Sequence, residues 1–183
     1  MPDDLTIRLK QLKIVHYNDT KSRQTGVPNY DIDIKKAYGD GRAFELMTEL
    51  LGQRLAQRTT CIAVSKDDGL LLAGALAASY GLNQSFVRTK LYSRLYAKAW
   101  ELVAQGLFID YDFPKCIEGY VPSKSDKVAI VGGVFSDSEN LENIIDIITP
   151  TGAEIVGCYV LFKQREGQLS VPVESVLRIE NLL

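Results

Sequence analysis

The amino-acid sequence predicts an α/β fold in which helices flank a parallel sheet. Two observations support this expectation. Short apolar runs, which are typical of buried strands, alternate with helical segments at the spacing of crossover connections. The chain has 183 residues, of which 46% are hydrophobic and 24% are charged, enough for one soluble domain that buries its own core.

The N-terminal part of the chain shows a loop, a strand and a helix in that order. A polar stretch at residues 18–26 is typical of a loop. Apolar and polar residues alternate over residues 30–35, which predicts a half-exposed strand. From Arg42 to Arg58, apolar residues recur at helical spacing, and this pattern predicts a helix with one buried stripe.

Strands and helices then alternate to the end of the chain. Gly81 is expected to stop the first helix of this part. The stretch 91–106 also has the apolar face of a helix, which we expect to pack on the domain or on a second subunit. The expected strands are 60–64, 85–88, 127–131 and 154–162, and the expected helices are 69–80 and 138–148.

Composition excludes several classes of protein. A formal net charge of -2, from 21 basic and 23 acidic residues, gives no overall attraction to nucleic acid or to an anionic membrane. No apolar stretch is long enough to span a bilayer, and the acidic N-terminus has no signal core. The three separated cysteines, Cys61, Cys116 and Cys158, predict reduced thiols in a cytoplasmic protein without a metal site.

Ligands of open parallel sheets bind beyond the carboxyl ends of the strands. In this chain those ends direct attention to residues 65–69, 88–90 and 132–140.

Five segments, taken in order, resemble those of type I phosphoribosyltransferases, and most closely of orotate phosphoribosyltransferases. The resemblance covers nearly the whole chain from Lys21 onward. It implies a parallel sheet flanked by helices, with residues 1–36 as a small N-terminal hood and residues 37–183 as the core, into which the helix at 91–106 is inserted. It also implies a cytoplasmic homodimer of pyrimidine metabolism. The five segments are Pro28–Lys35, Asp68–Ala77, Phe86–Lys90, Gly152–Gly157 and Gln164–Ser175.

The motif for the family's donor substrate, phosphoribosyl pyrophosphate (PRPP), is altered in this chain. Family members have an apolar strand followed by Asp-Asp-Val-x-Thr-Thr-Gly-Gly-Thr, in which the two acids face the ribose hydroxyls and the small loop wraps the 5-phosphate. Here residues 132–140 are Gly-Gly-Val-Phe-Ser-Asp-Ser-Glu-Asn. Gly132 and Gly133 replace the two acids, and the phosphate loop has gained Asp137 and Glu139.

Acidic side chains in a phosphate loop oppose the binding of the donor. A carboxylate about 4 Å from a phosphate charge is repelled by about 4 kcal/mol at an effective dielectric of 20. Because the phosphate is dianionic, two such carboxylates together cost more than the affinity of about 8 kcal/mol that a micromolar ligand has. Asp137 or Ser138 is instead expected to cap the following helix.

Two further departures point the same way. The pyrophosphate-facing loop carries Asp67 and Asp68, where the family usually has small residues. The segment 91–115, in the place of the family's catalytic loop, contains no histidine. Because all three changes affect one site, we interpret them as the loss of PRPP-dependent catalysis.

We assign no catalytic residue and no metal ligand. Arg88 and Arg165 align with basic residues that family members direct at orotate or pyrophosphate, as does Lys21, for which a solvated loop position is favoured. Ser136 replaces a base-contacting threonine of the family. The candidate ligand-binding residues are Lys66, Asp67, Asp68, Gly69, Arg88, Lys90, Gly132, Gly133, Ser136, Asp137, Ser138, Glu139, Asn140 and Arg165.

The sequence leaves three interpretations of function open. The first is a noncatalytic binding or regulatory module whose ligand is a nucleotide, a pyrimidine-like acid or another protein, with no cofactor. The second is an active orotate phosphoribosyltransferase in which Mg²⁺ bridges Asp137 or Glu139 to the donor. In the third, a basic segment around Arg88 to Lys98 docks on the acidic segment around Asp137 to Asp146, although both are also typical of solvated helix faces. We expect no nucleic-acid partner.

Overall fold

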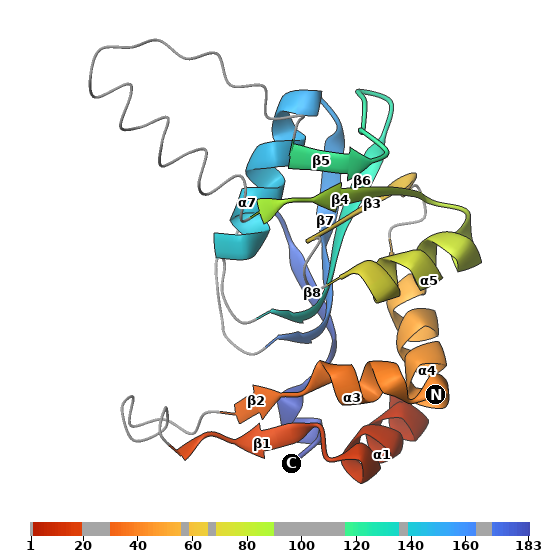
Figure 1. The fold of residues 1–183 in the computed structure, drawn as a ribbon, viewed down its shortest axis with the longest axis vertical. Helices are drawn as coiled ribbons and strands as arrows, with labels where there is room; N and C mark the ends of the chain where they lie inside the picture. The colour runs from red at the N-terminus through yellow and green to blue at the C-terminus, as the bar shows by residue number, and fades with distance from the viewer. Residues whose placement is uncertain are drawn as a thin grey trace.

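The computed structural model describes residues 2–19, 30–55, 59–65, 69–89, 116–135, 139–163 and 170–183. Its centre is a six-stranded sheet with the strand order β5-β4-β3-β6-β7-β8 (Figure 1). All neighbouring strands are parallel except β4 and β5, which pair antiparallel. The strands are β3 (Cys61–Ser65), β4 (Asn83–Val87), β5 (Ile117–Gly119), β6 (Lys127–Phe135), β7 (Glu154–Lys163) and β8 (Val173–Leu177).

Helices cover both faces of the sheet. On one face, α4 (Gly41–Gly52) and α5 (Leu70–Tyr80) pack on the side chains of Ile62 and Val64. On the other, α7 (Glu139–Ile148) packs on Cys61 and Ala63. Since successive side chains of a strand point to opposite faces, a central strand with both faces covered must be apolar throughout. The apolar run from Cys61 to Val64 in β3 meets this requirement.

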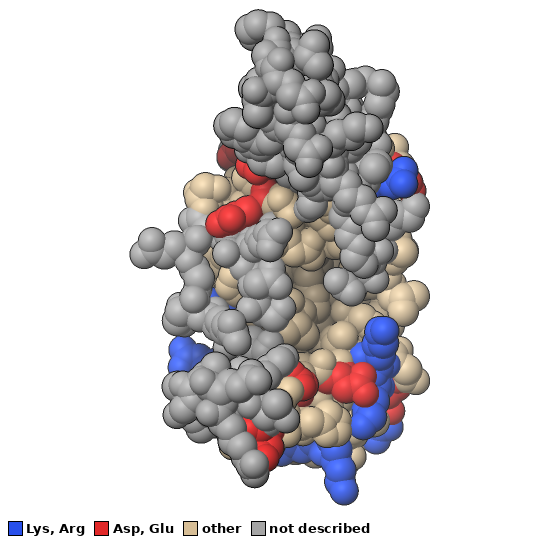
Figure 2. All heavy atoms as spheres, turned by 60° about the vertical axis from the view of Figure 1, so that its left-hand side comes forward, with Lys and Arg blue, Asp and Glu red and all other residues tan. Residues whose placement is uncertain are grey.

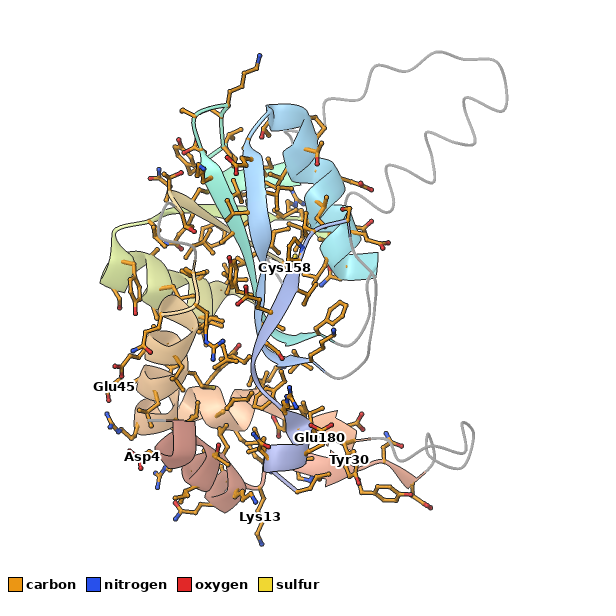
Figure 3. All side chains as sticks on the ribbon, turned by 180° about the vertical axis from the view of Figure 1, so that it is seen from behind. Asp4, Lys13, Tyr30, Glu45, Cys158 and Glu180 are labelled. Carbon is orange, nitrogen blue, oxygen red and sulfur yellow. The ribbon has the colours of Figure 1, made fainter. Side chains whose placement is uncertain are left out.

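The N-terminal hood lies at one end of the sheet (Figure 1). It contains α1 (Pro2–Leu12), the antiparallel strands β1 (Val15–Tyr17) and β2 (Tyr30–Ile32), and α3 (Ile34–Gly39). The C-terminal 3-10 helix η3 (Ile179–Asn181) lies beside the hood, as the labels of Tyr30 and Glu180 in Figure 3 show. A second 3-10 turn, η2 (Thr149–Thr151), joins α7 to β7.

One continuous core joins the hood to the sheet. Leu5 and Leu9 of α1 belong to the same buried cluster as Val64, Leu161 and Ile179. The boundary at residue 36 that we expected between hood and core is therefore not marked by a break in packing.

The α/β fold predicted from the sequence is confirmed, and so are the expected strands around 60–64, 85–88 and 154–162. The expected strand at 30–35 is wrong beyond Ile32. The N–H of Asp33 donates to the carbonyl of Ile14 at 2.8 Å, and after this last link to β1 the chain turns into α3.

The helix expected to reach Arg58 ends at Gly52. The apolar stripe misled the prediction because Leu55, in the turn after the helix, still packs against the core. The expected strand at 127–131 runs on to Phe135. Gly81 stops α5 as expected, in the left-handed conformation with φ of 64°. The expected helix at 91–106 lies outside the described residues, among which no helix is long and apolar enough to cross a membrane.

Candidate functional site

The carboxyl ends of the parallel strands form the edge at which a ligand is expected. Ser65, Val87, Phe135 and Lys163 are the last residues of β3, β4, β6 and β7. The hood lies over the β6 end of this edge, since Ile34 and Tyr38 of α3 approach Gly133. In the face shown in Figure 2, uncharged side chains line a hollow above a cluster of charged residues. We refer to this region as the crevice.

Gly69 brings the start of α5 to the end of β3. Its N–H donates to the carbonyl of Ser65, the last residue of β3, at 3.1 Å. A Cβ at Gly69 would lie 2.8 Å from the Cβ of Val64, which leaves no room for a side chain. Lys66, Asp67 and Asp68 lie outside the described residues.

Arg88 follows β4 directly, and its position is fixed by β5. Its N–H donates to the carbonyl of Cys116 at 2.9 Å, and its guanidinium Nε lies 3.5 Å from a carboxylate oxygen of Glu118. Both side chains are about half exposed, at 45% and 40%. This ion pair partly neutralises the positive charge of Arg88, which the sequence analysis expected to face an anionic ligand. Glu118 was missed because β5 is a three-residue edge strand with no periodic pattern.

Gly132 and Gly133 lie within β6, where the sequence placed them in a loop. Gly132 pairs with Val160 of β7, and the ladder continues to Phe135 opposite Lys163. A Cβ at Gly132 would meet Val160 Cγ1 at 3.5 Å, an ordinary contact.

Gly133 has no such space. A Cβ there would lie 2.7 Å from the hydroxyl oxygen of Tyr38 and 3.4 Å from Ile34 Cγ1. Sequence reasoning missed Tyr38 entirely, although a signal was present. Glycine inside a strand often marks the close approach of another group, and two adjacent glycines in an otherwise apolar strand are such a mark.

The remaining candidates stay predictions. Asn140 is the second residue of α7, and Glu139 is the first, although the side chain of Glu139 is not described. Of the described candidates, the structure brings Gly132, Gly133 and Asn140 to the β6 end of the edge and Gly69 and Arg88 to the ends of β3 and β4. Lys21, Lys66, Asp67, Asp68, Lys90, Ser136, Asp137, Ser138 and Arg165 lie outside the described residues.

The three cysteines are buried and free. Burial raises the pKa of Cys61 to about 11 and that of Cys158, in the middle of the sheet (Figure 3), to about 12. Burial also raises the pKa of Cys116, although nearby Arg88 acts in the opposite direction. All three thiols are therefore protonated at neutral pH and are not nucleophiles. Among the described residues, no three His, Cys, Asp or Glu side chains are grouped to hold a metal ion.

Comparisons with known proteins bear on the fold. No protein-family model matches the chain. An adenine phosphoribosyltransferase from Solidesulfovibrio magneticus is 26% identical over 154 residues, which cover 80% of this chain and 87% of that protein.

Solved structures give a closer match in shape. An orotate phosphoribosyltransferase from Aeropyrum pernix superposes with a TM-score of 0.70 at 21% identity, over 97% of this chain and 96% of the other. A Mycobacterium tuberculosis orotate phosphoribosyltransferase, crystallised with Fe(III) dicitrate, also has a TM-score of 0.70, at 16% identity over 99% and 98%. The fold implied by the five sequence segments is thus confirmed.

Proposed function

We propose that this chain, which has the fold of type I phosphoribosyltransferases, is a ligand-binding or regulatory module that does not use PRPP as a donor. One observation carries the proposal. Gly132 and Gly133 stand at the end of β6, in the positions where the resemblance places the two acids that face the ribose. Glycine has no side chain that accepts a hydrogen bond from a hydroxyl group.

The missing carboxylates weaken donor binding substantially. A hydrogen bond to a charged group contributes about 1.5–3 kcal/mol, so the loss of two such bonds lowers affinity by about a hundredfold or more. Asp137 and Glu139, if they face the phosphate as the resemblance implies, add repulsion of about 4 kcal/mol for each carboxylate-phosphate pair. Together these effects exceed the binding energy of a micromolar ligand.

At the β4 end of the edge, Arg88 supports the proposal that the chain still binds a ligand. Arg88 keeps its guanidinium half exposed at the end of β4, next to Glu118. A cation and a carboxylate side by side suit a ligand that has both an acidic group and hydrogen-bond donors. We therefore propose a pyrimidine-like acid or a nucleotide as the ligand class.

Isothermal titration with PRPP and Mg²⁺ tests the loss of donor binding. We expect no saturable heat at millimolar PRPP, while an active orotate phosphoribosyltransferase titrated in the same buffer binds normally. Micromolar binding by this chain would overturn the proposal.

A second function, an active transferase with a divergent donor site, is favoured by the similarity to an adenine phosphoribosyltransferase. In that case Mg²⁺ would relieve the repulsion between Asp137 or Glu139 and the donor. Depletion of orotate and of adenine, each measured with PRPP, Mg²⁺ and concentrated protein, separates the two functions. We expect no turnover of either base, and turnover of one would establish the active transferase.

A further inference from the structure

Tyr38 of α3 reaches β6 from the hood and covers Gly133. Its hydroxyl oxygen lies 2.7 Å from the position that a Cβ on Gly133 would occupy, and its Cζ lies 3.7 Å from the same point. Real Cβ atoms essentially never lie within 3.0 Å of another group, so a side chain at residue 133 requires the hydroxyl of Tyr38 to shift. Two segments almost a hundred residues apart in the chain thus meet at a point where the absence of a side chain allows the close approach.

The tyrosine ring is held in place. It packs edge-to-face against the ring of Phe44 in α4, with centroids 5.7 Å apart and an interplanar angle of 83°. Its hydroxyl oxygen is buried, and Ala37, the residue before it, is fully buried. On the other side of Gly133, Ile34 Cγ1 lies 3.4 Å from the Cβ position. The contact with Phe44 restricts the ring, so a shift of the Tyr38 hydroxyl away from Gly133 disturbs its packing against α4.

We propose that Tyr38 and Gly133 form a lock that holds the hood against β6 and permanently closes the crevice at the position of the lost acid. This lock rests on the proposed function, in which the chain no longer binds PRPP. It adds that the contact between Tyr38 and Gly133 is what closes the crevice. An acid at residue 133 would have to displace the Tyr38 hydroxyl, which lies 2.7 Å from the position of its Cβ.

Gly132 provides the matched control, since it is the adjacent glycine of the same strand. A Cβ there meets only Val160 Cγ1, at 3.5 Å. Alanine at residue 132 therefore fits without displacement, whereas alanine at residue 133 does not. Any general effect of replacing glycine in a strand is common to the two positions.

The test compares thermal midpoints of Gly133→Ala and Gly132→Ala, each in the natural background and together with Tyr38→Phe. We expect Gly133→Ala to lower Tm by roughly 3–8 °C, since overpacking a buried position strains its neighbours, and Gly132→Ala to change it little. With Tyr38→Phe the nearest ring atom is Cζ at 3.7 Å, so most of the loss caused by Gly133→Ala should disappear. This recovery is the signature of a direct contact.

Two results would overturn the lock: equal Tm values for Gly133→Ala and Gly132→Ala, or an undiminished loss when Tyr38→Phe is present. If Gly133→Ala alone does not fold, a folded Gly133→Ala/Tyr38→Phe protein supports the lock, and failure of both overturns it. None of these measurements involves PRPP. Failure of the lock is thus distinguishable from failure of the proposed function, which is decided by the titration.

Discussion

Asp126, which directly precedes β6, is a buried carboxylate held by four hydrogen bonds. The hydroxyls of Thr60 and Tyr120 each donate to it at 2.9 Å. Ser123 donates twice, from its N–H at 2.8 Å and from its hydroxyl at 2.9 Å. The residue lies at the amino end of β6, away from the crevice, so its role is to fix the loop between β5 and β6.

These bonds determine the ionisation of Asp126. Burial alone would raise the pKa of its carboxyl, but the hydrogen bonds from Ser123, Tyr120 and Thr60 together hold that pKa below its usual value of 3.8. A carboxyl whose pKa is lower in the folded than in the unfolded chain stabilises the fold above the unfolded pKa. That contribution is lost as the pH falls through the folded pKa.

We expect Asp126→Asn to lower the free energy of unfolding at pH 7 by about 1–3 kcal/mol, because some donors lose a charged acceptor. The gap between the two proteins should narrow as pH falls below about 4, where the carboxyl of the unfolded chain becomes protonated while that of the folded chain keeps its charge. Urea unfolding over this pH range measures both effects.

Ser123→Ala serves as the control for this experiment. It removes one of the four hydrogen bonds and leaves the carboxylate, so it should lower stability less and keep the acid dependence. A constant gap between natural protein and Asp126→Asn from pH 7 to 3 would contradict the assignment.

At the scale of elements, Asp40 joins two helices of the hood region. Its carboxylate accepts from the N–H of Ala43 at 2.9 Å, which caps the start of α4. It also accepts from Nε of Arg8 in α1 at 3.1 Å, and a second guanidinium nitrogen of Arg8 pairs with its other oxygen. The hydrogen bond from Arg8 and the N–H of Ala43 lower the pKa of Asp40.

Three substitutions separate the cap from the ion pair. Asp40→Ala removes both and should lower Tm the most, by a few degrees. Asp40→Asn keeps a capping oxygen and loses the charge, so its effect should match that of Arg8→Ala. Thermal unfolding at low and high salt measures the difference, since salt weakens only the ion pair. Equal effects of Asp40→Ala and Asp40→Asn would show that the cap contributes nothing.

Across the whole molecule, the C-terminus packs on the hood. Ile179 and Leu182 are each 8% exposed and share a cluster with Leu5 and Leu9 of α1. Fully burying a large aliphatic side chain contributes about 1.5–3 kcal/mol, so the two C-terminal residues contribute roughly 3–6 kcal/mol. That is a large share of the 5–15 kcal/mol typical of a domain.

Truncation after Arg178 should therefore lower Tm strongly and leave a single transition, because hood and sheet share one core. Deletion of Leu183 alone is the matched control. Its side chain is 61% exposed, so its removal should leave Tm unchanged. Differential scanning calorimetry measures both variants. A separate low-temperature transition of the hood in the natural protein would contradict a shared core.

The helices and strands were predictable from the sequence wherever apolar residues recur at a regular spacing within a segment. The apolar run of β3 and the Gly81 stop of α5 appeared where local patterns placed them. The same reasoning ended β6 too early, because a Gly-Gly pair resembles a loop in sequence, while hydrogen bonding to β7 keeps it in the ladder. Local propensity is a weak guide where pairing with a neighbouring strand supplies the stabilising bonds.

The sequence by itself determined the α/β class and the order of the strands and helices. That Gly132 and Gly133 replace two acids stays a prediction of the family resemblance. Only the tertiary structure decided which side chains lie next to the candidate residues. Tyr38 lies against Gly133, and Glu118 lies beside Arg88. The spacing of apolar residues and the local composition describe each segment by itself, because both are set by residues a few positions apart. A contact between distant segments depends instead on how the hood and the edge strand pack, and no local pattern encodes that packing.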